Sequence, residues 1–251
     1  MTFSEAELER YARHIVLHEI GGPGQQKLKA AQVLVIGAGG LGAPAIQYLA
    51  AAGVGTVGIV DDDVVSLSNL QRQVIHATEE VGRPKVASAA HAVHRINPEI
   101  GVRRHQIRLT EANAPTIFED YDLVLDGSDN FETRYLVNRV AAEQAIPLVF
   151  AALGRWEGQI SVFDPARGAP CYECIFPESP APGLVPPCAE AGVLGALAGV
   201  LGAMQAAEAV KLITGAGTPL SGRLMLYDAL GADIRTIRLA ARDDCPVCGS
   251  G

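Results

Sequence analysis

The chain has 251 residues, of which 49% are hydrophobic and 19% are charged, and its formal net charge is −8. This composition supplies one large apolar core, and the acidic balance argues against nucleic acid as the main partner, because a phosphate backbone requires a basic surface. The first residues, MTFSEAELERYARH, lack the apolar segment of a signal peptide, so we expect a cytoplasmic protein.

The first expected element is a helix that begins after Ser4. Ser4 and Glu7 have the spacing of a capping box, and Leu8, Tyr11 and Ile15 give the helix an apolar face. We expect this helix to end at the stretch GGPG, residues 21–24.

Strands and helices then alternate along the chain. Short apolar runs predict strands near residues 32–37, 57–61 and 147–153, and further strands are expected near residues 102–107 and 122–130, the latter running into a polar loop. Helices are expected between them, one after the glycine-rich turn within residues 37–55 and others near residues 85–96, 112–119 and 133–144. This alternation is typical of an α/β fold with a doubly wound, mostly parallel, Rossmann-like sheet. The later segments GQISVFD, RLMLYDAL and DIRTIRLA are predicted to add antiparallel strands.

Two segments interrupt this pattern. Residues 176–188 contain five prolines, so we expect a long mobile loop there. Residues 191–204 form an uncharged apolar run, shorter than the roughly 20 residues that a membrane span needs. Gln205, Glu208 and Lys211 continue the same helical pattern, which favours a buried core helix or a subunit-interface helix and no membrane association.

The stretch GAGGLG, residues 37–42, fits the dinucleotide-binding pattern between a strand and a helix. Gly39 would let the backbone approach a phosphate, and the helix N-terminus offers free N–H groups to an anion. Asp61 ends the next strand, at the spacing for contact with a ribose hydroxyl. These features alone fit a nicotinamide-dependent dehydrogenase as well as any other nucleotide enzyme.

Two cations and a further carboxylate belong to the same edge of the predicted sheet. Arg72 lies in SNLQRQ, Lys85 begins a helix after Pro84, and Asp129 follows the fourth strand. A nicotinamide cofactor offers only a pyrophosphate, whereas two cations and an acidic Mg²⁺ ligand suit a reacting triphosphate. Either cation alone would more often be a surface charge.

The two acidic neighbours of Asp61 have less definite roles. Asp62 is expected to be a solvated turn residue, whereas Asp63 either assists a metal or orients a neighbouring side chain.

Four of the five cysteines form two C-x-x-C pairs, Cys171 with Cys174 and Cys245 with Cys248. Two such pairs are typical of a closed, structural Zn(Cys)₄ site, and disulfides are not expected in a reducing cytosol. Cys188 lies in the proline-rich segment. It is either a nucleophile or acyl acceptor, or an ordinary cysteine, and its spacing does not decide between these.

The motifs GAGGLG, SNLQRQ, VGRPK, DGSDN, EGQISVF, CYEC, CAEAGV and CPVC occur in this order. Together they resemble the MoeB/ThiF family, which comprises adenylyltransferases for ubiquitin-like sulfur-carrier proteins and is related to ubiquitin-activating enzymes. The resemblance covers nearly the whole chain and is somewhat closer to MoeB. We therefore expect a single domain over residues 1–251, with an N-terminal helical arm (1–24), a nucleotide-binding core (25–165) and a part with the crossover loop, zinc site and C-terminal strands (166–251).

The resemblance implies a set of site residues. ATP would be bound by Gly39, Gly40, Asp61, Ser68, Asn69, Leu70, Gln71, Arg72, Lys85, Asp129 and Asn130, with Mg²⁺ held at Asp129. Catalysis would depend on Arg72, Lys85, Asp129 and Arg13, the last reaching into the partner subunit of a homodimer. Cys188 matches a loop cysteine that forms a covalent link to the carrier in some relatives.

The implied reaction is the ATP-dependent adenylylation of the C-terminal glycine of a MoaD-like carrier in molybdenum cofactor biosynthesis, with release of pyrophosphate. The same reaction on a ThiS-like carrier of thiamine biosynthesis is an alternative. Three others are a nicotinamide-dependent oxidoreductase, a non-catalytic zinc-stabilised scaffold, and an enzyme that adenylates a tRNA-attached carboxylate. The acidic net charge speaks against the last.

Overall fold

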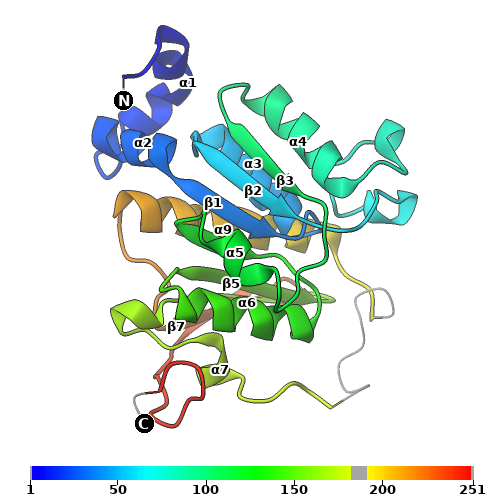
Figure 1. The fold of residues 1–251 in the computed structure, drawn as a ribbon, viewed down its shortest axis with the longest axis vertical. Helices are drawn as coiled ribbons and strands as arrows, with labels where there is room; N and C mark the ends of the chain where they lie inside the picture. The colour runs from blue at the N-terminus through cyan, green and yellow to red at the C-terminus, as the bar shows by residue number, and fades with distance from the viewer. Residues whose placement is uncertain (1, 182–190, 250–251) are drawn as a thin grey trace.

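A computed structural model describes residues 2–181 and 191–249 of the chain. These residues form a sheet of eight strands in the order β3-β2-β1-β4-β5-β6-β7-β8 (Figure 1). The strands are β1 (Gln32–Ile36), β2 (Thr56–Val60), β3 (Gly101–His105), β4 (Leu123–Asp126), β5 (Leu148–Gly154), β6 (Glu157–Phe163), β7 (Arg223–Asp228) and β8 (Asp233–Arg238). The first five pair in parallel and the last three are antiparallel, which confirms the predicted fold class.

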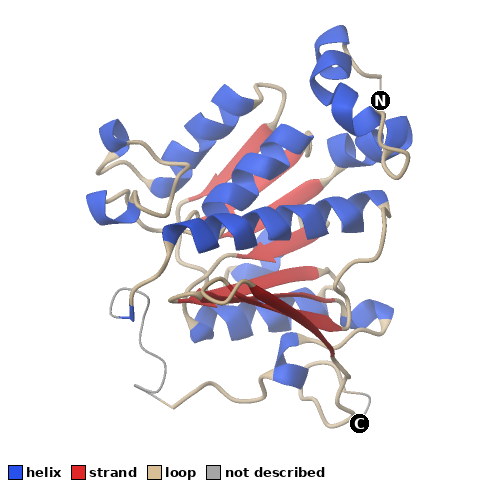
Figure 2. Cartoon of the chain, turned by 180° about the vertical axis from the view of Figure 1, so that it is seen from behind, coloured by secondary structure: helices blue, strands red, loops and turns tan. Residues whose placement is uncertain are grey.

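Helices cover both faces of the sheet (Figures 1 and 2). One face carries α3 (Gly42–Ala52), α4 (Lys85–Ile96) and α9 (Gly195–Thr214), and the other carries α5 (Ala114–Phe118), α6 (Phe131–Glu143) and α7 (Tyr172–Ile175). Val33 and Val35 enter the first core, whereas Leu34 and Ile36 enter the second. Because successive side chains point to opposite faces, a strand buried on both sides is apolar throughout.

The N-terminal region differs from the expectation. The capping box is present, since Ser4 Oγ accepts from the Glu7 N–H at 3.2 Å and Glu7 Oε2 accepts from the Ser4 N–H at 2.8 Å. However, α1 (Glu5–Ile15) ends before GGPG, and that stretch begins α2 (Gly21–Ala30) instead of ending a helix. Pro23 sits in the first turn of α2, where N–H groups have no intrahelical partner, so proline is tolerated there.

Helix α9 lies against the sheet. Among the described residues it is the one helix whose length and apolar composition would suffice to cross a membrane, yet 44% of its apolar window is buried inside the fold. Gln205 Nε2 donates to the carbonyl oxygens of Asp126 and Val149, at 2.8 and 3.1 Å. The helix also packs on α3, β5 and β6, so it occupies the position of a core helix, one of the two placements expected.

Gly202 sets how closely α9 approaches the start of α3. A Cβ on Gly202 would overlap the carbonyl oxygen of Leu41 and crowd Pro44. We expect Gly202→Ala to lower the free energy of unfolding, measured by chemical denaturation, by about 1–3 kcal/mol, the usual cost of overpacking.

The matched control is Gly199→Ala on the same helix, where no tertiary contact lies within 4 Å of the new Cβ among the described residues. This change should be neutral or stabilise the fold by up to about 1 kcal/mol through higher helix propensity. Equal destabilisation by both changes would contradict this account of helix packing.

Candidate active site

A cavity of about 570 Å³ lies at the carboxyl ends of the parallel strands. β1 stands between β2 and β4 in the sheet, so the strand order reverses there, and doubly wound sheets bind their ligands at such a point. The predicted residues that line this cavity are Gly39, Gly40, Asp61, Arg72, Lys85, Asp129 and Asn130. The fold therefore brings together side chains from loops that are far apart in the sequence.

The glycine loop joins the end of β1 to the start of α3. Gly37 has a φ angle of 87°, a conformation that side chains disfavour, and its N–H donates to the Val60 carbonyl oxygen at 2.8 Å. A Cβ on Gly42 would overlap the carbonyl oxygen of Gly37. Glycine at these two positions lets the loop turn tightly and presents the N-terminus of α3 to the cavity.

Asp61 ties this loop to the end of β2. Its Oδ2 accepts from the Ala38 N–H at 2.8 Å, and its Oδ1 accepts from the Asp63 N–H at 2.9 Å. Burial raises the pKa of the Asp61 carboxyl, and the charge of Lys85 opposes this shift. Each carboxylate oxygen has a second lone pair, so the side chain can still accept from hydroxyl groups of a ligand.

Lys85 brings a buried positive charge to the cavity. Its side chain is only 7% exposed, and its Nζ lies 2.8 Å from Oδ2 of the exposed Asp63. This ion pair fits one of the two roles considered for Asp63, the orientation of a neighbour; the other, assistance to a metal, is also compatible with the structure, since carboxylate oxygens of Asp61, Asp62 and Asp63 lie within 4.8 Å of one another. Asp62 is exposed, as expected of a turn residue.

The SNLQRQ segment follows β2 and begins with the 3-10 turn η1 (Leu67–Asn69). Arg72 Nη1 donates to the Ser68 carbonyl oxygen at 3.1 Å, and Arg72 lies beside the glycine loop at Gly40. Asn69 Oδ1 accepts from the Ser66 N–H at 3.2 Å, so this side chain shapes the turn. Ser68, Asn69, Leu70 and Gln71, all of them described, are not among the residues that line the cavity.

Asp129 and Asn130 stand on the opposite wall, after β4. Both are exposed. Asn130 Oδ1 accepts from the Thr133 N–H at 2.8 Å and so caps α6. The Asp129 carboxylate is an oxygen ligand of the kind that Mg²⁺ prefers, so its place on the cavity wall fits the predicted role.

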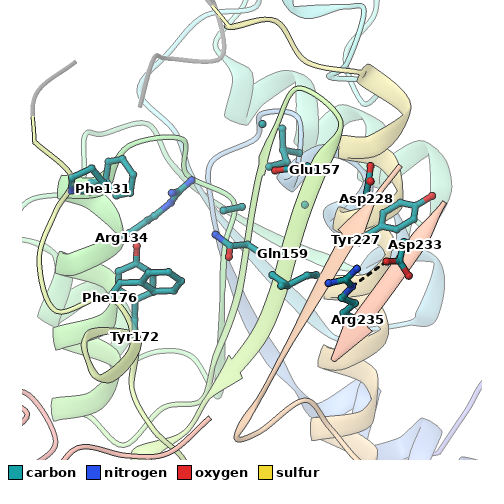
Figure 3. A pocket seen from close by; sticks show the side chains of 16 residues that line it. Phe131, Arg134, Glu157, Gln159, Tyr172, Phe176, Tyr227, Asp228, Asp233 and Arg235 are labelled. Atoms are coloured by element: carbon teal, nitrogen blue, oxygen red, sulfur yellow. Dashed lines mark hydrogen bonds and ion pairs between the residues drawn. The ribbon is translucent and has the colours of Figure 1, made fainter. Parts of the chain in front are cut away.

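A second cavity, of about 600 Å³, adjoins the first over the antiparallel strands (Figure 3). The two cavities share Phe131, Arg134, Leu153 and Gly154 as lining residues. Farther from the junction the wall comes from β6, β7 and β8 and includes Gln159, Tyr227 and Arg235, with Arg235 Nε paired to Asp233 Oδ2 at 3.0 Å.

Four polar residues near the cavities were missed by the sequence analysis. Arg134 Nη2 donates to the Ser128 carbonyl oxygen at 3.2 Å and so supports the loop that carries Asp129. Burial raises the pKa of the Asp126 carboxyl, against the charge of Arg134. Gln73 lines the cavity, and His76 lies behind the glycine loop. For three of them the sequence signal was proximity, because Gln73 and His76 follow Arg72, and Arg134 lies one turn after Asn130; Asp126 ends a strand, which is the signal that identified Asp61.

The four paired cysteines come together at the end of the sheet beyond α7. Their Sγ atoms all lie within 4.8 Å of one another, with Cys171–Cys245 at 3.5 Å and Cys174–Cys248 at 3.3 Å. Four sulfur ligands at about 2.3 Å from zinc would be about 3.8 Å apart, so the cluster fits this ion. Burial raises the pKa of the Cys171 thiol and raises that of Cys248 to about 11. Burial also opposes ionisation of Cys245, but hydrogen bonds from the backbone at Cys248 and Val247 lower its pKa to about 7. A cation in the cluster would favour the thiolate form of Cys171 and Cys248 as well.

Arg13, one of the predicted catalytic residues, lies elsewhere. Arg13 is exposed on α1, which lies beside α2 and the amino end of β1, and it does not line either cavity of the described structure (Figure 1). Cys188, with the later part of the proline-rich segment, lies outside the described residues.

Known proteins resemble this chain in sequence and in fold. A sulfur carrier protein adenylyltransferase of Thermus thermophilus is 50% identical over 253 residues, which cover 99% of this chain and 93% of that protein. A SAMP-activating enzyme E1 of Haloferax volcanii is 49% identical, over 100% of this chain and 92% of that protein. A crystal structure of Escherichia coli MccB with ATP shares the fold, with a TM-score of 0.83 at 23% identity, over 95% of this chain and 74% of that one. The model of the ThiF family matches residues 11–247, and the chain belongs to this family.

Proposed function

We propose that this chain transfers the AMP group of ATP to the C-terminal glycine of a small ubiquitin-like sulfur-carrier protein in the cytoplasm. The observation that carries the proposal is a cavity that holds a glycine loop, Asp61, two cations and Asp129 together. The name of the Thermus relative, at 50% identity over nearly the full length of both chains, supports the same activity.

The proposed position of ATP follows from the chemistry of the walls. Asp61 accepts from the ribose hydroxyls, and the backbone at Gly39 and Gly40 approaches the phosphates. Arg72 and Lys85 provide the positive charge that the phosphates need. Asp129 would hold the Mg²⁺ that accompanies ATP, whose charge would offset that of the phosphate oxygens. If the ligand were a nicotinamide cofactor, these cations and Asp129 would have no comparable role.

The second cavity is the proposed entry for the carrier. The two cavities share Arg134 and Leu153 as lining residues, and we propose that an extended chain end passes there from the sheet surface into the nucleotide cavity. There the terminal carboxylate attacks the α-phosphorus of ATP, the bond from this phosphorus to the bridging oxygen breaks, and pyrophosphate leaves with the bond electrons. A carboxylate is already ionised at neutral pH, so no general base is needed. Positioning and charge stabilisation then account for catalysis.

The carrier is proposed to be MoaD-like, because the segments RYARHIVL, SNLQRQ, VGRPK and CAEAGV resemble MoeB. This choice places the reaction in molybdenum cofactor biosynthesis. A ThiS-like carrier of thiamine biosynthesis is the alternative, and exchange assays with each purified carrier would separate the two.

Loss of Arg72 is the first test of the site. We expect Arg72→Ala to reduce carrier-dependent exchange of labelled pyrophosphate into ATP by about 10²–10³-fold, because a charged donor to the reacting phosphates is removed. Arg139→Ala is the matched control, since Arg139 on α6 pairs with Glu111 and does not line the cavity.

Two results would count against the proposal. Unchanged exchange in Arg72→Ala would remove Arg72 from the site. No exchange by the unaltered protein with either type of carrier, together with tight NADH binding, would favour the oxidoreductase.

Arg13 is proposed to complete the site of the partner in a homodimer, because it is exposed and lies away from the cavity of its own chain. Mixed dimers test this, with Arg13→Ala in one chain and Arg72→Ala in the other, purified through two different tags. One of the two sites is then intact, so we expect about half of the wild-type exchange activity. If Arg13 acted within its own chain, these dimers would be inactive.

The cysteine cluster is proposed to hold a structural zinc ion. Metal analysis should find one zinc per chain, and Cys245→Ser should lose the metal and lower the melting temperature by several degrees or more, because metal binding contributes to folding. The control is Cys188→Ser, which should keep its zinc. If Cys188 accepts the acyl group, this variant also lacks the thioester adduct that mass spectrometry would detect in the unaltered protein.

A further inference from the structure

His76 is buried behind the glycine loop and contacts it through one ring nitrogen. Nε2 lies 2.9 Å from the Ala38 carbonyl oxygen, and Nδ1 lies 2.7 Å from Ser88 Oγ on α4. Because a carbonyl oxygen only accepts, the first contact requires a hydrogen on Nε2. Ala38 is also held on its other side, through the hydrogen bond from its N–H to Asp61.

The chain of contacts continues from Ser88 to a carboxylate. Ser88 Oγ makes a short hydrogen bond to Oε2 of Glu80, the last residue of the 3-10 turn η2 (Thr78–Glu80). Glu80 Oε1 accepts from Arg83 Nη1 and lies 3.0 Å from His91 Nδ1. Ser88 is fully buried and Glu80 is 8% exposed, so water does not readily replace a lost partner.

These contacts cannot all be satisfied by a neutral histidine and an ionised glutamate. Ser88 has one hydrogen, and it can give it either to Glu80 or to Nδ1 of His76. One additional proton resolves the conflict in two equivalent ways. His76 then carries hydrogens on both nitrogens beside an ionised Glu80, or Glu80 is protonated and donates to Ser88, which donates to Nδ1.

We propose that His76 is a positioning residue for the nucleotide loop, and that the proton it shares with Glu80 through Ser88 keeps the Ala38 carbonyl anchored. This inference rests on the proposed function, because the loop next to Ala38 carries Gly39 and Gly40 of the nucleotide cavity. Without the additional proton, Ser88 binds Glu80 and His76 moves its hydrogen to Nδ1. The anchor on Ala38 is then lost and ATP binds less tightly.

The charges around the network set the direction of its pH dependence. Burial lowers the pKa of His76, Lys85 acts in the same direction, and Asp61 and Glu80 act against it. On Glu80, burial opposes ionisation, but the hydrogen bonds from Ser88 and His91 outweigh burial and, with the charge of Arg83, lower its pKa. The network therefore releases its proton as the pH rises, and because the pKa of His76 lies below its ordinary value, ATP affinity should fall in the acid half of the range of about pH 5 to 8, where imidazoles titrate.

The test measures the dissociation constant of ATP by calorimetry across this range in four variants. His76→Leu removes the donor to Ala38 and should weaken binding about tenfold at the acid end, the effect of one lost hydrogen bond. His76→Gln keeps an N–H donor but does not titrate, and Glu80→Gln donates permanently to Ser88. Both variants should bind ATP tightly, and their dissociation constants for ATP should not depend on pH. His94→Gln, an exposed histidine on α4, should behave like the unaltered protein.

Ratios of unaltered protein to variant cancel the titration of ATP itself. The inference is overturned if His76→Gln and Glu80→Gln follow the pH profile of the unaltered protein, or if His76→Leu binds ATP equally well. Nitrogen NMR of His76 in the nucleotide-free protein gives a second readout, with a hydrogen expected on Nε2 at the acid end of the range. Its absence there would overturn the network, whereas failure to bind ATP with Nε2 protonated would overturn the proposed function alone.

Discussion

Two contacts of the Ala38 backbone fix the position of the glycine loop that lines the cavity. The Ala38 N–H binds Asp61 at the end of β2, and its carbonyl oxygen faces His76, which leads through Ser88 to α4. The backbone of one residue of the glycine loop is thereby tied to the end of a strand and, through His76 and Ser88, to a helix. Since α4 also begins with Lys85, the same element that supports the loop brings in a cation.

Because the whole chain is acidic, the cations that line the cavity must provide the attraction for an anionic ligand. A protein with a net charge of −8 repels anions in general, so a phosphate ligand must be attracted by local charges. Lys85 supplies such a charge from a buried position, where its pairing with exposed Asp63 offsets part of the cost of desolvation. Arg72 adds a second cation from a flanking loop, beside Gly40.

Sequence patterns predicted the central strands well because a parallel strand that is buried on both faces is apolar along its buried length, as Val33 to Ile36 of β1 illustrate. They failed at GGPG, since glycine and proline are found both after helices and in the first turn of a helix. That Gly39, Asp61 and Asp129 line one cavity was predictable, because the carboxyl ends of parallel strands meet at one edge of the sheet. The pairing of Asp63 with Lys85 and the contact of His76 with Ala38 depend on how loops and helices approach in space, and no periodicity encodes that.

The positions of the four cysteines along the chain determine when the cluster can form during synthesis. Cys171 and Cys174 precede α9, β7 and β8, whereas Cys245 and Cys248 follow them. A growing chain that has only the first pair offers half of the ligands, so it cannot close a four-sulfur site around a metal. The cluster becomes complete only after the last strand has been made, and a metal held there would mark chains whose sheet is finished.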